Sequence, residues 1–237
     1  IAWANDNQNL FYMALQPATL IANQLWQHRV GSPASADKLR YEETDPEYFA
    51  YLTRARSGEQ IMLNITQTLS GEVRLIDANK PDAPLRTALP REPDHKYLVQ
   101  ADGDQLYILT NWEAPNYRLM VAPLASSADK SSWREILAHR SDAYLDSFAI
   151  FDDYIAIQER SKGMLRLRVL GRSNDADYYL AASEDAFTMQ LDNNPNLDGT
   201  LLRYRYTSMT TPATVYDFDM KTRTQEPLKQ DKVVGDF

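Results

Sequence analysis

Several features that would mark particular classes of protein are missing from this sequence. It has no cysteine, which excludes disulfides and thiolate metal ligands. No apolar run is long enough to span a bilayer, and no charged segment followed by an apolar one opens the chain. These absences predict a cytoplasmic protein away from the membrane. The start at Ile1 leaves a periplasmic location open and predicts that the chain is a piece of a longer protein.

Glycine and histidine are also scarce. The eight glycines form neither a phosphate-binding loop nor a Gly-x-Ser-x-Gly motif, so the nucleophile turn of an α/β-hydrolase is absent. His28, His95 and His139 stand in no metal-binding spacing, and we predict that all three lie at the surface or in turns. We therefore assign no catalytic, cofactor-binding or metal-binding residue and expect no cofactor.

The chain carries a formal net charge of −8. Nucleic-acid binding needs a basic surface against phosphates, so this charge disfavours it. Ordinary solubility is sufficient to explain the charge, and attraction of cationic ligands or partners is also compatible with it.

The segment from Leu201 to Met220 shows the local pattern most clearly. Two alternating runs, LLRYRY and ATVYDFD, flank a polar turn that contains Pro212. Alternation places apolar side chains on one face of each run, so the segment predicts a β-hairpin. The polar faces predict cross-strand ion pairs between two arginines and two aspartates: Arg203 and Arg205 with Asp217 and Asp219.

Similar strand-like runs recur in groups of four along the whole chain. The groups cover residues 1–46, 47–94, 95–143, 144–185 and 186–237, with Gly, Asn, Asp and Pro turns between the runs. Four short antiparallel strands per unit of about 40–50 residues are typical of a β-propeller, in which each sheet packs against its neighbours. We predict an all-β propeller of about five blades. Middle runs such as QLYIL and YIAI are apolar on both faces, whereas EVRLID and WREIL are interpreted as outer strands.

Acidic residues gather in two places. One group is Glu42, Glu43, Asp45 and Glu47, and the other is Asp152 and Asp153. We interpret both as solvated turns, with a catalytic carboxylate pair of the kind used by glycosidases as the alternative. The sequence Asn64-Ile65-Thr66 matches a glycosylation site but lies in a predicted strand, so we interpret the match as chance.

An ordered set of longer motifs runs through nearly the whole chain. It comprises LWQHRVGSPASADKLRYEETDPEYF, ALPREPDHKYLV, FAIFDDYIAIQERSKGMLRLRV and YRYTSMTTPATVYDFDM. Together these motifs resemble the propeller of the oligopeptidase B (protease II) branch of the prolyl oligopeptidase family of serine peptidases.

The resemblance implies a parent protein with a seven-bladed propeller inserted into an α/β-hydrolase catalytic domain. Such a parent cleaves short peptides after Arg or Lys, especially at dibasic sites, with a Ser-Asp-His triad. The triad follows the propeller, so none of its members matches a position here, and the catalytic domain is absent from this chain. The closing segment VVGDF would be the exit strand or linker.

Three hypotheses for function follow. The first is a substrate-gating propeller fragment that is catalytically silent alone, with its own catalytic domain and short basic peptides as partners. The second is a stand-alone protein-binding propeller, and the third is a carboxylate-based glycosidase. Five blades from a ring of seven leave apolar faces uncovered, so we expect either a ring closed with five blades or self-association.

Overall fold

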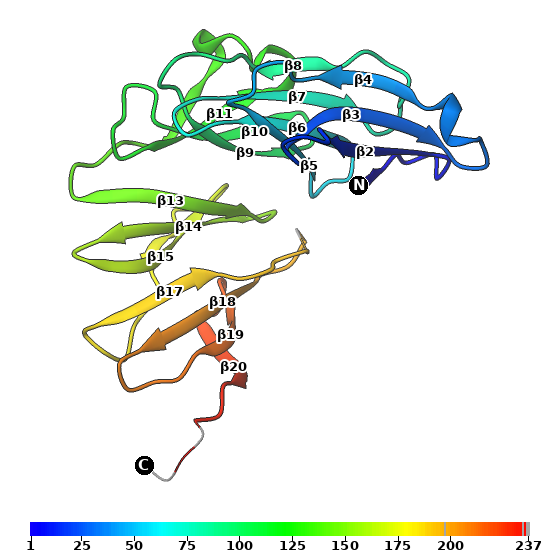
Figure 1. Cartoon of the computed structure of the whole chain (residues 1–237). Coiled ribbons are helices and arrows are strands. Elements are labelled where there is room, and N and C mark those ends of the chain that lie inside the picture. The colour runs from blue at the N-terminus through cyan, green and yellow to red at the C-terminus, as the bar shows by residue number, and fades with distance from the viewer. Residues whose placement is uncertain (197, 234, 236–237) are drawn as a thin grey trace. The chain divides into compact units, whose positions relative to one another are not determined.

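The computed structural model describes residues 1–196, 198–233 and 235, whose regular secondary structure is almost wholly β-strand (Figure 1). Helical structure in this part of the chain is limited to three short 3-10 turns: Ala34–Ala36, Leu124–Ser126 and Lys130–Ser132. None of the described helices is long and apolar enough to cross a membrane. The predicted all-β class is confirmed. The predicted exit segment, residues 233–237, lies mostly outside the described residues.

The chain divides into two compact units. The first unit comprises Ile1–Trp112 and Leu119–Ile136. Its strands form three four-stranded sheets in simple sequence order. The strands are β1 (Ala2–Trp3), β2 (Asn9–Leu15), β3 (Ala22–Arg29), β4 (Lys38–Glu42), β5 (Phe49–Arg54), β6 (Gln60–Thr66), β7 (Gly71–Asp77), β8 (Arg86–Leu89), β9 (Tyr97–Asp102), β10 (Gln105–Thr110), β11 (Arg118–Pro123) and β12 (Arg134–Leu137).

The second unit comprises Glu113–Arg118 and Leu137–Phe237. Its strands are β13 (Ala143–Ile150), β14 (Tyr154–Ser161), β15 (Met164–Gly171), β16 (Asp177–Tyr179), β17 (Phe187–Leu191), β18 (Leu201–Ser208), β19 (Thr214–Asp219) and β20 (Thr224–Gln230). They form two antiparallel groups of four, which a short parallel pairing between β15 and β17 joins into one sheet at Leu165 and Thr188. The limits given above for the five blades stay a prediction.

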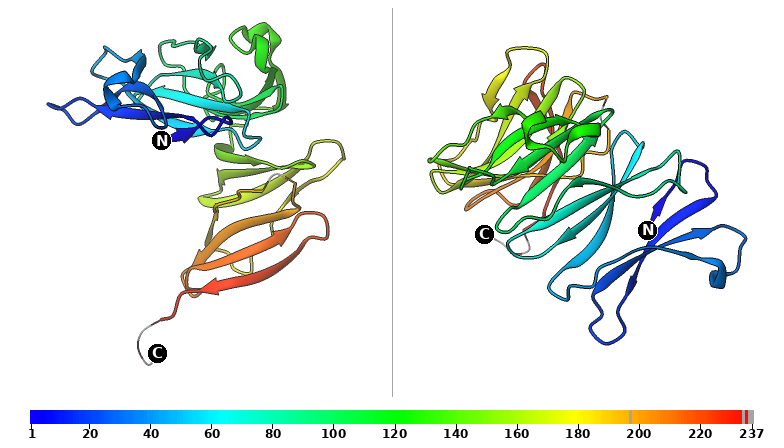
Figure 2. Two further views of the ribbon diagram at one scale, coloured as in Figure 1. Left: turned by 90° about the vertical axis from the view of Figure 1, so that its right-hand side faces the viewer. Right: turned by 90° about the horizontal axis from the view of Figure 1, so that it is seen from above.

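The sheet β5–β8 shows why the strands come in packed groups. One face contributes Ile61, Leu63 and Ile65 to a core shared with residues of β2 and β3. The other face contributes Met62 and residues of β7 to a core shared with β9 and β10. Both faces are therefore buried, and the three sheets of this unit lie side by side (Figure 2).

The prediction that the middle runs are apolar on both sides is confirmed, because β10 and β14 are buried along almost their whole length. The interpretation of EVRLID as an outer strand is wrong. This run is β7, the third of four strands, and Val73, Leu75 and Ile76 are all buried. The polar Glu72 and Arg74 made the strand look exposed, but these two side chains pair with each other.

The predicted hairpin is confirmed as β18 and β19, with Leu202, Tyr204 and Tyr206 buried on one face. Arg203 lies opposite Asp217, and its Nε and Nη2 donate to the two carboxylate oxygens at 2.7 and 2.8 Å.

The second predicted ion pair of this hairpin is wrong. Arg205 lies opposite Val215, and its nearest carboxylate is Asp192 at 3.5 Å. Asp219 instead accepts the backbone N–H groups of the following turn, at Lys221 and Thr222. The strand register therefore decides which charges meet.

The buried tyrosine of β18 offers a test of this packing. Tyr204 lies stacked on Tyr216 with ring centroids 5.4 Å apart, and its hydroxyl donates to Gln225. We expect Tyr204→Ala to lower the free energy of unfolding by about 3–5 kcal/mol, as aromatic truncations in cores do. The exposed neighbour Arg205→Ala should change it by about 0.5 kcal/mol or less. Urea unfolding of both variants measures the difference, and equal losses would contradict the assigned faces.

Candidate functional site

The acidic run predicted from the sequence lies where β4 leads into β5. Glu42 ends β4 and is exposed, as is Glu47, and Asp45 is half-buried. Glu43 differs, because only 5% of its surface is exposed. The interpretation of the run as a solvated turn is therefore wrong for Glu43, which faces inward.

Glu43 is held by an arginine that lies 48 positions later in the chain. Arg91 Nη2 donates to Glu43 Oε2 at 2.5 Å, and Arg91 Cζ lies 3.7 Å from the centre of the Tyr48 ring. Arg91 Nε lies 3.5 Å from Glu72 Oε2. We call Glu43, Tyr48, Glu72 and Arg91 the Arg91 clasp. It ties the connection after β4 to the connection after β8, and so ties the first sheet to the second.

The surroundings of Glu43 keep it charged. Burial by itself would raise the pKa of this carboxyl, but the hydrogen bonds from Arg91, from the Asp45 backbone N–H and from the Tyr41 hydroxyl hold the pKa below its ordinary value. Burial would lower the pKa of Arg91, but its hydrogen bond to Glu43 and the negative charges of Glu43 and Glu72 raise it. Because both oxygens of Glu43 already accept hydrogen bonds, the clasp fixes structure and leaves no free carboxylate for acid–base chemistry.

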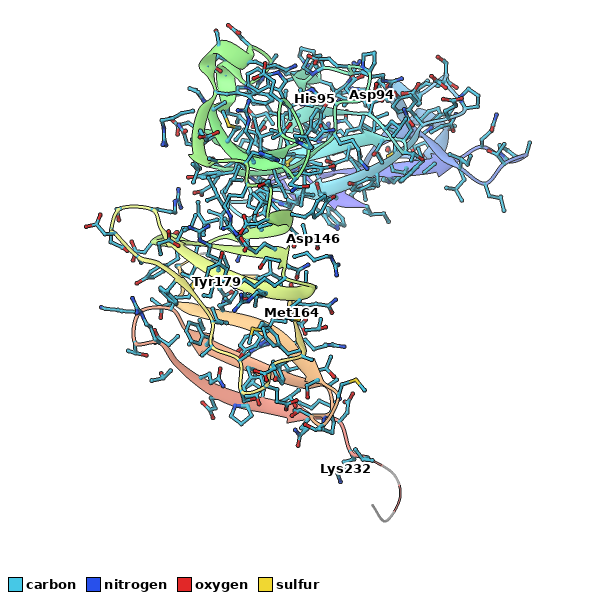
Figure 3. The ribbon with its side chains drawn as sticks, turned by 90° about the vertical axis from the view of Figure 1, so that its left-hand side faces the viewer. Asp94, His95, Asp146, Met164, Tyr179 and Lys232 are labelled. Carbon is cyan, nitrogen blue, oxygen red and sulfur yellow. The ribbon has the colours of Figure 1, made fainter. Side chains whose placement is uncertain are left out.

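The three histidines occupy different environments, and the prediction for His95 is wrong. His95 (Figure 3) is 6% exposed, with Nδ1 3.2 Å from Glu92 and Nε2 2.9 Å from Thr110 Oγ1. Burial lowers its pKa. His28 lies in β3 beside Asp37, and His139 lies half-buried after β12. In residues 1–196, 198–233 and 235, no three His, Cys, Asp or Glu side chains gather as metal ligands.

The remaining candidates lie where the sequence placed them. Asp152 and Asp153 are exposed in the turn between β13 and β14. Asn64 and Thr66 lie in β6, and the Asn64 amide donates to Thr53 Oγ1 and to the Met62 carbonyl.

The two ends of the sheets differ in chemistry. Turns that follow the first strand of a sheet expose acids, at Asp6, Glu59, Asp104, Asp152 and Asp153. Three of the turns that follow a second strand expose apolar tips, at Leu20, Leu69 and Met209, of which Met209 is 91% exposed. Met209 borders an open groove of about 310 Å³ that Met164 and Phe187 also line. We did not predict this asymmetry, although the apolar residues within QPATLI and TSMTTPA signal it.

Sequence comparison gives the context of these features. Residues 1–231 match the family described as prolyl oligopeptidase, N-terminal beta-propeller domain. The chain belongs to the prolyl oligopeptidase family. It represents the propeller and not the catalytic domain of these serine peptidases, so the resemblance and the fold inferred from the sequence are confirmed.

Individual relatives agree with this assignment. Dipeptidyl aminopeptidase BI of Pseudoxanthomonas mexicana is 36% identical over 99% of this chain and 32% of its own length. Protease 2 of Moraxella lacunata is 27% identical over 99% of the chain and 33% of its own length. The chain thus spans about a third of the length of these two relatives.

Solved structures extend the likeness to the fold. Oligopeptidase B from Leishmania major matches 98% of this chain and 34% of its own, with a TM-score of 0.90 and 27% identity. Oligopeptidase B from Trypanosoma brucei, closed with covalently bound antipain, matches 100% and 34%, with a TM-score of 0.90 and 25% identity.

Removing the buried charge tests the clasp. We expect Glu43→Gln to lower the free energy of unfolding at pH 7 by about 2 kcal/mol, within the 1.5–3 kcal/mol of hydrogen bonds to charged groups. Glu42→Gln, on the exposed neighbour, is the matched control and should have little effect.

The pH dependence gives a second readout. The pKa of Glu43 is lower in the folded protein than its ordinary value of 4.5, so its stabilisation is complete above that value and is lost as the pH falls through the folded pKa. The stability gap between wild type and Glu43→Gln should therefore narrow below about pH 4.5. A gap that is independent of pH would contradict an ionised Glu43.

Proposed function

We propose that this chain is the part of a propeller that controls substrate entry to a serine oligopeptidase, which cleaves short peptides after Arg or Lys. The observation that carries the proposal is the match of residues 1–231 to the propeller domain of that family. The chain has no Gly-x-Ser-x-Gly motif, which supports a silent role for the fragment alone. Its lack of cysteine supports a cytoplasmic location.

The packed sheets supply the physical basis for entry control. Sheets with both faces buried form stiff walls, because core packing tolerates little displacement. A wall of this kind excludes folded proteins from an enclosed catalytic site and admits flexible peptides. The Arg91 clasp adds a charged tie between the first two sheets at the point where the chain passes from one to the next.

Related full-length peptidases contain a catalytic domain together with this propeller. In the second unit, we assign the docking of that domain to the end of the sheet that carries Met209. In an antiparallel meander the turn after the second strand and the end of the fourth strand share one end of the sheet. Gln230, the last residue of β20, therefore lies at the apolar end of its sheet, where the chain continues.

A second candidate is removal of dipeptides from peptide N-termini. The 36% identity to a protein named dipeptidyl aminopeptidase BI favours it. Both candidates use the same propeller and differ in whether the substrate must have a free N-terminus.

Peptides with a blocked and a free N-terminus distinguish the two activities. We expect the full-length peptidase to cleave an N-acetylated ten-residue peptide after an internal Arg-Arg pair, and to leave the same sequence intact when it lies inside a folded domain. Mass spectrometry of the products measures this. Cleavage only of the unacetylated peptide, with release of dipeptides, would support the second candidate and contradict the first.

The unpaired acids of the run after β4 should act through long-range attraction. Changing Glu42, Asp45 and Glu47 to Gln, Asn and Gln should lower kcat/KM for basic peptides by about two- to tenfold at low ionic strength, and the loss should disappear in high salt. The control changes Asp104, Asp152 and Asp153 to Asn, which alters the net charge equally at the other sheet ends. Equal losses for both triple variants would show an effect of net charge alone.

A further inference from the structure

Two aromatic side chains stand exposed at the start of β5. The strand alternates, so that Tyr48 and Ala50 are buried while Phe49 and Tyr51 are 48% and 40% exposed. Their rings are stacked, with centroids 6.2 Å apart and planes inclined by 28°. Large aromatic side chains bury much surface when they can, so a stacked and exposed pair suggests a surface that binds a partner.

The backbone of β5 is also open on one side. β5 is the first strand in the order β5-β6-β7-β8, and it pairs only with β6 among the described strands. Alternate N–H and C=O groups of an edge strand therefore point away from the sheet. An extended peptide can add to such an edge as a further strand.

The rings have polar and not apolar neighbours on their own sheet. Phe49 lies opposite Thr66, and Tyr51 lies opposite Asn64. An apolar ligand would gain little beyond the two rings, whereas a cation keeps polar surroundings while it lies over a ring face.

Negative charge lies directly before the strand. Asp45 and Glu47 precede Phe49, and neither has an ion-pair partner in the described part of the chain. The Asp45 carboxylate accepts the Glu47 N–H at 3.0 Å, which fixes the turn. The buried Tyr48 also holds this turn in place, because its ring packs against the Arg91 guanidinium and its hydroxyl forms a hydrogen bond with Ser70 Oγ. Two unpaired acids that directly precede a pair of exposed rings in the chain are complementary to Arg and Lys side chains.

We propose that the edge of β5, through Phe49 and Tyr51, binds an extended basic peptide. The Arg or Lys side chains lie over the two rings, and the peptide backbone pairs with the open side of β5. This inference rests on the proposed function, because it names the surface that would receive a peptide before it reaches the catalytic domain. No bond is made or broken at this surface.

Binding to the full-length peptidase tests the proposal without requiring cleavage. The probe is a fluorescein-labelled ten-residue peptide with an Arg-Arg pair and a reduced, non-hydrolysable bond after it. A second probe replaces both arginines with citrulline, which keeps the shape and removes the charge. Fluorescence anisotropy gives Kd for each probe.

The variants distinguish the contribution of the aromatic rings to binding from that of apolar side chains in general. Phe49→Leu combined with Tyr51→Leu should weaken binding of the arginine probe by about five- to tenfold, as expected for loss of two exposed cation–π contacts. Binding of the citrulline probe should stay within about twofold. The conservative pair Phe49→Tyr with Tyr51→Phe keeps both rings and should bind the arginine probe like wild type. Leu39→Ala, at an equally exposed apolar residue of β4, is the control and should change neither Kd.

Two results would overturn the proposal: an unchanged Kd for the arginine probe in the leucine variant, or equal losses for both probes. Loss of binding in the ring-preserving pair would also count against it, because a general disturbance of the strand would then explain the effect. The function proposed above is tested separately by wild-type cleavage of a short chromogenic Arg substrate. If wild type does not cleave that substrate but the predicted Kd values are observed, the peptidase assignment is contradicted and the peptide-binding surface is not.

Discussion

The structure depends on the burial of both faces of a four-stranded sheet between its neighbours, as the sheet β5–β8 shows. Ile61, Leu63 and Ile65 point to one neighbouring sheet, and Met62 between them points to the other. Exposure of either apolar face of such a sheet to water is unfavourable, so the sheet is stable only between neighbouring sheets. The same alternation that defines a strand thus forces the sheets to pack in series.

This constraint explains why chemistry gathers at sheet edges and ends. The buried faces of the sheet β5–β8 carry mostly aliphatic side chains, which leaves its first strand and its turns more exposed. The first strand of this sheet, β5, alternates between buried and exposed residues, whereas the last strand, β8, has no exposed residue. The Arg91 clasp then fixes the turn that presents β5, with buried Tyr48 setting the direction of exposed Phe49. The same short segment, from Glu43 to Tyr51, therefore joins the first two sheets and carries the proposed peptide-binding surface.

Much of the fold was predictable because strand alternation is a local property. The hairpin β18–β19, the groups of four strands and the buried middle strands follow from the period of two in the sequence. The sequence did not reveal partners that are distant along the chain. Glu43 looked solvated because its partner Arg91 belongs to another sheet, and His95 looked exposed because Thr110 and Trp133, which enclose it, come later. The ion pair predicted for Arg205 was wrong for a different reason, because the pairing register of two strands cannot be read from their charges alone.

Hydrogen exchange in the full-length peptidase would show whether the faces of the sheet β5–β8 are closed while its first edge is open. We expect slow exchange for the amides of β6 and β7 and faster exchange for the outward amides of β5. Addition of the non-hydrolysable basic peptide should slow those β5 amides alone. Exchange of β6 as fast as that of β5, or β5 amides already fully protected without peptide, would contradict this arrangement.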